Sequence, residues 1–256
     1  MTLSRVVRGP LAAAALSAFA FLVPGSALHA AAVAPAPAPT KAPVIELAPG
    51  DVAASNEKIA MAYGSLVKMW TNEFQRVGEQ FAAPRLARYT GGVMTSCGVI
   101  MPHNAEYCPR NNTIFYDEVF VAGMAKAAAT SLGTDGDMAA IGVIAHEMGH
   151  AVAIQLGYES RNSYENESTA DCLAGTFTRQ AQRDGELEKG DIDEAFFGMS
   201  MAGDPTPEAT GNRRVDAMIQ ARLARESHGT REQRMQNFRT GLDGGPGACL
   251  DEFSNQ

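Results

Sequence analysis

Residues 141–150 read IGVIAHEMGH, an apolar run that carries two histidines four positions apart and a glutamate directly after the first. Turn and capping residues on both sides of this run predict a helix over 138–156. Residues i and i+4 of a helix lie about 40° apart around its axis. His146 and His150 can therefore point two imidazole rings at one ion.

The residue types at these positions suit zinc. Zn²⁺ favours imidazole nitrogen as a ligand. Glu147 lies about 100° further round the helix than His146, beside such an ion rather than on it, where a general base belongs. The alternative is a pair of histidines at polar spots on a core helix. The complete His-Glu-x-x-His pattern in a helical context disfavours that interpretation.

A catalytic zinc site needs a third protein ligand. The stretch YENESTADCLAG, residues 164–175, begins a second predicted helix over 164–183. Glu167 and Asp171 share one face of it, so Glu167 is the expected third ligand. Asp171 is expected to accept the ring N–H of a ligating histidine, with His146 as the preferred partner. A solvated helix face is the alternative, and three competing third ligands lack a supporting carboxylate on the same face: Glu159, Glu165 and His103.

The remaining periodicity predicts mostly helix. Apolar residues recur at helical spacing over 54–82, before Pro84, and further helices are expected over 191–202, 212–226 and from Thr230 to Gly241. Ser163 is the expected N-cap of the helix over 164–183, and two capping boxes are expected, Asp191 with Glu194 and Thr230 with Gln233. Strand character appears only at 86–94 and 112–117. The fold class expected is α+β, a mostly helical domain with a small β-sheet or hairpin.

The amino terminus has the layout of an exported protein. Residues 1–32 combine two early arginines, an apolar run over 11–23 and small residues at the end, which is typical of a signal peptide. Residues 33–50 form a Pro/Ala-rich linker, and 51–256 form the expected zinc-binding domain. The chain is therefore expected to be periplasmic or secreted. The alternative is an uncleaved membrane anchor over 11–23.

Four cysteines in an exported chain predict two disulfides. Three pairings are possible, and the local pair Cys97–Cys108 is favoured, which leaves Cys172–Cys249. The net charge of −8 argues against a nucleic acid or an anionic membrane surface as partner. Contact with a membrane is expected only if the leader is not cleaved.

Several segments together resemble a known family. HEMGH followed by NESTAD is similar to zincin peptidases whose third zinc ligand is a glutamate. The chain more closely resembles a bacterial family of neutral zinc metallopeptidases. The resemblance covers most of 55–252, through YCPRNNTIFYD (107–117), VIAHEMGHAV (143–152), ADCLAG (170–175), GDIDEA (190–195) and HGTREQRMQNFRTGL (228–242). It implies a zincin-like domain, zinc on His146, His150 and Glu167, and Glu147 as the catalytic residue.

The expected function is zinc-dependent hydrolysis of peptide bonds, with one Zn²⁺ per chain and a peptide or protein as substrate. His228 is the candidate donor to the oxyanion and Tyr164 the second choice. An exposed loop histidine is an equally open interpretation of His228. A non-catalytic, zinc-stabilised binding or chaperone-like module of the cell envelope is the alternative function, and a cell-wall amide is an alternative substrate.

Overall fold

The computed structural model describes residues 46–254. The expected signal peptide, the alternative anchor over 11–23 and most of the expected linker lie outside this range. Within 46–254, no helix combines the length and apolar character that a membrane span requires.

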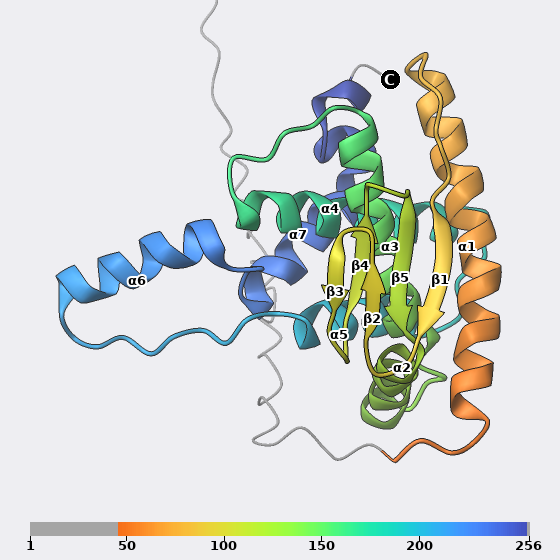
Figure 1. Ribbon diagram of the computed structural model, residues 1–256, viewed down its shortest axis with the longest axis horizontal. Helices are drawn as coiled ribbons and strands as arrows, with labels where there is room; N and C mark the ends of the chain where they lie inside the picture. Colours follow the sequence, from red (N-terminus) through yellow and green to blue (C-terminus); the bar gives the residue numbers. More distant parts are fainter. Residues whose placement is uncertain (1–45, 255–256) are drawn as a thin grey trace, which may run out of the picture. The chain divides into compact units, whose positions relative to one another are not determined.

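The described chain is mostly helical with a small sheet, which confirms the α+β fold class (Figure 1). The helices are α1 (Asp51–Arg76), α2 (Glu118–Leu132), α3 (Asp137–Gln155), α4 (Ser163–Asp184), α5 (Asp191–Met201), α6 (Arg213–Glu226) and α7 (Arg231–Gly244). The strands are β1 (Arg85–Tyr89), β2 (Val93–Thr95), β3 (Gly98–Ile100), β4 (Ala105–Cys108) and β5 (Thr113–Asp117). Two short 3₁₀ turns, Pro246–Ala248 and Asp251–Phe253, follow α7.

The main sheet has the strand order β1-β5-β4, with β1 parallel and β4 antiparallel to β5. The strand expected over 86–94 is in fact two strands, because Gly91 has a φ of 83° and breaks the run between β1 and β2. β2 pairs with β3 in a separate hairpin. β4, which the sequence did not predict, forms one edge of the main sheet.

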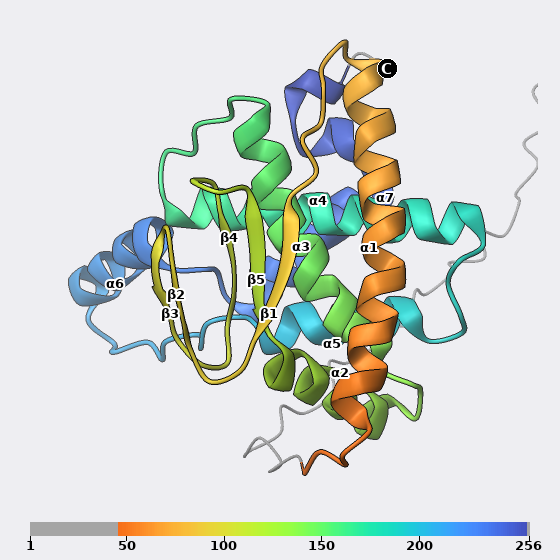
Figure 2. The same cartoon turned by 45° about the vertical axis from the view of Figure 1, so that its right-hand side comes forward.

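The helix with the two histidines, α3, lies in the core. Figures 1 and 2 show it behind the sheet, with α1 on the β1 side. Its apolar side chains, such as Ile144, Met148 and Val152, are buried, and Leu173 of α4 and Trp70 of α1 belong to the same cluster. Each such side chain contributes about 1.5–3 kcal/mol when it leaves water. Most of the predicted helix over 138–156 is therefore packed into the core.

Close backbone contact brings α3, α4 and α7 together. A Cβ at Gly149 of α3 would lie 2.8 Å from the carbonyl oxygen of Ala170 on α4. A Cβ at Gly241 of α7 would overlap the carbonyl oxygen of Cys172. Only glycine permits these two approaches, and they set how far side chains from one helix reach toward the next.

Several helix ends differ from the sequence expectation. Gly136 is the N-cap of α3, and the N–H groups of Gly136 and Met138 both donate to Glu194 of α5, at 2.9 Å each. Glu194 therefore does not form the expected capping box with Asp191, because it caps another helix. The cap of α4 is Asn162, one residue before the expected Ser163.

Three further differences concern helix length. α1 ends at Arg76 rather than at residue 82, and α7 continues past Gly241 to Gly244. α2 was not expected. The capping box of Thr230 and Gln233 at the start of α7 is confirmed.

Two disulfides cross-link the domain, Cys97–Cys108 and Cys172–Cys249, and they confirm the predicted pairing. Cys97–Cys108 links the turn of the β2–β3 hairpin to the end of β4. Cys172–Cys249 links α4 to the segment after α7.

Candidate metal centre

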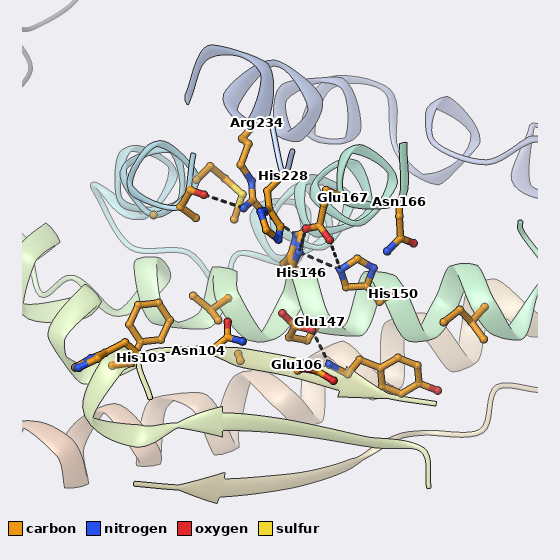
Figure 3. A pocket seen from close by; sticks show the side chains of 18 residues that line it. His103, Asn104, Glu106, His146, Glu147, His150, Asn166, Glu167, His228 and Arg234 are labelled. Atoms are coloured by element: carbon orange, nitrogen blue, oxygen red, sulfur yellow. Dashed lines mark hydrogen bonds and ion pairs between the residues drawn. The ribbon is translucent and has the colours of Figure 1, made fainter. Parts of the chain in front are cut away.

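Three side chains from α3 and α4 converge on one point (Figure 3). His146 Nε2 lies 3.1 Å from Glu167 Oε2 and 3.2 Å from His150 Nε2. His150 Nε2 lies 3.6 Å from Glu167 Oε1. The i, i+4 spacing on α3 and the close packing at Gly149 together place these atoms.

The separations suit a tetrahedral zinc ion. Bonds of about 2.0–2.2 Å at tetrahedral angles put neighbouring ligand atoms about 3.3–3.6 Å apart. Two imidazoles and one carboxylate are also a donor set found in catalytic zinc sites, which keep one position for water or substrate. Two of the separations here, 3.1 and 3.2 Å, are slightly shorter, so small shifts of the three side chains would let them hold Zn²⁺.

Asp171 lies behind His146, where the sequence placed it. Its Oδ1 is 2.8 Å from His146 Nδ1, and its side chain is fully buried. When the ring is neutral and its N–H at Nδ1 donates to this carboxylate, the lone pair of Nε2 faces His150 and Glu167. This is the arrangement that orients a metal-binding histidine.

Arg234 of α7 is a buried member of the site that sequence reasoning missed. Its Nη2 donates to Asp171 Oδ1 at 2.6 Å and its Nε to Asp171 Oδ2 at 3.0 Å. Its Nη1 donates to the carbonyl oxygen of Ala202 at 3.1 Å. One signal was available: Arg234 shares the apolar face of its predicted helix with Phe238, and an arginine on a buried face requires a partner.

Glu147 is buried beside the three converging side chains. Its Oε2 accepts a hydrogen bond of 2.7 Å from the backbone N–H of Tyr107 on β4. Burial raises the pKa of Glu147 to about 7, although His146 and the Tyr107 amide oppose the shift. The carboxylate is therefore able to take up a proton near neutral pH.

The two histidines titrate differently. Burial lowers the pKa of His150 to about 4. Burial and Arg234 also oppose a charged His146, but hydrogen bonds to Asp171 and Glu167 outweigh them and raise its pKa to about 10. Burial opposes the ionised form of Glu167 as well, yet His146 holds its pKa down at about 2. The site thus favours a positive charge between His146 and Glu167.

A cleft of about 490 Å³ opens beside these side chains. Its walls come from β4, α3, α4, α5 and α7, and it is lined by both histidines, Glu147, Glu167 and Arg234. Phe120, Val143 and Met199 add apolar surface. A chain of a few residues fits such a space.

His228 lines this cleft, but its side chain is 61% exposed. Its ring Nδ1 lies 3.8 Å from Asp204 Oδ1, and its backbone N–H donates to Asp204 Oδ2. Tyr164, the second choice, does not line the cleft and packs against Gly229. The role of His228 as a donor stays a prediction.

The competing third ligands are not in the converging group. Glu165 forms an ion pair with Arg161, and Glu159 is exposed. His103 lines the cleft without joining His146, His150 and Glu167.

A second acidic group, at the amino-terminal end of α3, already has a cation. It consists of Asp135, Asp137, Asp191 and Glu194. Lys58 Nζ lies 2.7 Å from Asp137 and 3.1 Å from Asp135. Glu194 accepts from the first amides of α3. This group therefore has a structural role in joining α1, α3 and α5.

Comparison with known proteins agrees with the resemblance. YpfJ of Escherichia coli strain K12 is 33% identical over 205 residues, which are 72% of this chain and 66% of YpfJ. YpfJ of Escherichia coli O6:H1 matches with the same values. The chain thus spans just under two thirds of the length of these relatives. No solved structure matches it. A family model described as "Putative neutral zinc metallopeptidase" matches residues 35–253, and the chain belongs to that family.

Proposed function

We propose that the chain is a zinc-dependent endopeptidase that binds one Zn²⁺. The observation that carries the proposal is the convergence of His146 Nε2, His150 Nε2 and the Glu167 carboxylate at 3.1–3.6 Å, beside a buried Glu147 and an open cleft. A structural zinc site usually closes all four positions with protein ligands, mostly cysteine. Here all four cysteines are in disulfides.

His146, His150 and Glu167 would hold the ion. Zinc would supply a Lewis acid that polarises the scissile carbonyl and acidifies water. Glu147 accepts the proton of the attacking water and then delivers it to the leaving amine. The Tyr107 amide holds one oxygen of Glu147, so the other oxygen is free to carry this proton.

Asp171 and Arg234 keep His146 in the productive orientation. Asp171 favours one tautomer through its hydrogen bond to Nδ1, and Arg234 holds Asp171 with three hydrogen bonds. His228, on the cleft wall, is the proposed donor to the oxyanion of the tetrahedral intermediate.

The edge strand supports an extended peptide as the substrate. β4 forms one wall of the cleft, and the N–H of Tyr107 points away from β5, toward Glu147. Backbone groups on a strand alternate in direction, so those of Ala105 face the same side as those of Tyr107. A peptide lying along this edge would hydrogen-bond to β4 while its carbonyl meets the metal centre.

We also propose that the protein acts outside the cytoplasm. The structure contains two disulfides, and disulfides form and persist mainly in oxidising compartments outside the cytoplasm. The expected export signal over 1–32 is part of this proposal.

The test compares the wild type with Glu147→Gln. Purified protein of both kinds is loaded with zinc and incubated with a mixed peptide library, and products are read by mass spectrometry. We expect both proteins to bind about one zinc per chain and only the wild type to cleave. If the wild type releases no more product than the variant, the endopeptidase function is wrong and the non-catalytic binding module is favoured.

A further inference from the structure

We propose that Glu106 is a specificity-determining residue that binds a positively charged group of the peptide substrate. The cation is either a lysine or arginine side chain near the scissile bond or the free amino-terminal ammonium group. The proposal rests on the proposed peptidase function, because it concerns the cleft of the same site.

Glu106 stands at the centre of the cleft wall. It is on β4 between Ala105 and Tyr107, and Tyr107 is the residue whose amide holds Glu147. Glu106 lines the cleft, and Figure 3 shows it on the strand below Glu147. A substrate that lies along β4 with its scissile bond at Glu147 therefore passes Glu106.

The carboxylate of Glu106 has no partner in the described part of the chain. Among residues 46–254, no hydrogen bond or ion pair involves its oxygens, whereas Glu147, Glu167, Asp171 and Glu194 are all satisfied. It is half-buried, and burial raises its pKa. A partly desolvated carboxylate without a partner is unfavourable, and a cation entering the cleft would relieve this cost.

The surroundings of Glu106 are negative. Burial raises the pKa of nearby Tyr89 to about 12, and the charges of Asp117, Glu106 and Glu147 add to the shift. Such a cluster of carboxylates favours cations and repels acidic peptides.

The positive groups of the cleft are already used. Arg234 is paired with Asp171. The two charges of a bound zinc ion would be balanced by Glu167, one of its proposed ligands, and by the neighbouring Glu147. His103 and His228 line the cleft, but neither contacts Glu106. The negative charge of Glu106 therefore has no positive partner in the cleft and is available to bind a cation of the substrate.

The first experiment measures kcat/KM for matched peptides that differ at one position, lysine, norleucine or glutamate, each with a free or an acetylated amino terminus. For the wild type we expect about tenfold faster cleavage of a cationic peptide than of its neutral match. Glu106→Gln should abolish the preference and still cleave the neutral peptide. The matched control is Glu57→Gln, which removes an exposed charge on α1 outside the cleft and should keep the preference.

The two sources of the cation give different results. If lysine improves cleavage of acetylated peptides, the cation is a side chain. If only the free amino terminus matters, the cation is the terminal ammonium group, and the peptidase acts at chain ends rather than as an endopeptidase. Glu106→Lys should reverse the preference toward the glutamate peptide, which a variant with a merely loosened cleft would not do.

The second experiment measures binding without turnover. Fluorescence anisotropy of labelled lysine and norleucine peptides is recorded with zinc-loaded Glu147→Gln and with the same protein carrying Glu106→Gln. We expect the lysine peptide to bind about tenfold more tightly than the norleucine peptide to the first protein, and the two peptides to bind equally to the second. Circular dichroism checks that all variants are folded.

The failures can be told apart. If the wild type cleaves charged and neutral peptides equally and Glu106→Gln changes nothing, the role of Glu106 is refuted while the peptidase function stands. If no peptide is cleaved but the lysine peptide still binds through Glu106, the peptidase function falls and the recognition of a cation stands.

Discussion

The buried pair of Asp171 and Arg234 is predicted to couple the stability of the domain to its metal affinity. Arg234→Met keeps much of the side-chain volume but removes all three hydrogen bonds, of 2.6, 3.0 and 3.2 Å, to Asp171. Hydrogen bonds to charged groups contribute about 1.5–3 kcal/mol each. Removing one partner of a buried ion pair costs about 3–5 kcal/mol, because the other charge is left without compensation.

We therefore expect Arg234→Met to lower the free energy of unfolding by about 3–5 kcal/mol. At about 2–4 °C per kcal/mol for a domain of this size, Tm falls by about 6–20 °C. The assay is urea and thermal unfolding of metal-free protein, followed by a chelator competition for zinc. Zinc affinity should fall about 10–100-fold, because Asp171 no longer holds His146 firmly.

The control is Arg225→Met on α6, an exposed arginine whose removal should change stability by less than about 0.5 kcal/mol. The double variant Asp171→Asn, Arg234→Met removes both charges. Its loss of unfolding free energy should be smaller than the sum of the losses in Asp171→Asn and Arg234→Met, by at least about 2 kcal/mol. A loss below about 1 kcal/mol in Arg234→Met, or strict additivity in the double variant, would refute the reasoning.

Three further predictions concern how the helices are held. Gly149→Ala places a methyl group 2.8 Å from the Ala170 carbonyl oxygen. Its free energy of unfolding should therefore fall by about 1–3 kcal/mol in denaturant titration, and calorimetry should show weaker zinc binding. Glu194→Ala leaves the backbone N–H groups of Gly136 and Met138 without an acceptor. Denaturant titration should show that the free energy of unfolding falls by about 2–4 kcal/mol, and by less in Glu194→Gln. Replacing Cys172 and Cys249 by alanine opens a loop with a sequence separation of 77. The free energy of unfolding should fall by about 4.5 kcal/mol and Tm should fall with it, so an unchanged Tm would contradict the prediction.

The sequence predicted those parts of the site that depend on local spacing. His146 and His150 are one helical turn apart, and Glu167 and Asp171 are one turn apart on the next helix, so helical periodicity alone places each pair on one face. The short connection between the two helices then favours their packing against each other. The α+β fold class followed from the same periodicities.

The sequence could not predict interactions between distant segments. Arg234 lies 63 residues from Asp171, and Glu194 accepts from an amide 58 residues earlier in the chain. No local pattern connects such positions. The edge strand β4 was missed for a different reason: it is only four residues long and its sequence, AEYC, has no alternation to recognise. Glu106, the residue that we propose recognises the substrate, lies on that strand.

Arg234 also limits how strongly the site favours a protonated His146. Asp171 alone would stabilise the doubly protonated ring, and a proton on Nε2 competes directly with a metal ion. Burial opposes that protonation, and so does the positive charge of Arg234. The hydrogen bonds to Asp171 and Glu167 still raise the pKa of His146 to about 10, and Arg234 keeps it from rising further. Asp171 thus orients the ring of His146, and Arg234 compensates the negative charge of Asp171. A neutral substitute for Arg234 should therefore make zinc binding more sensitive to acid, with the loss of binding beginning at a higher pH than in the wild type.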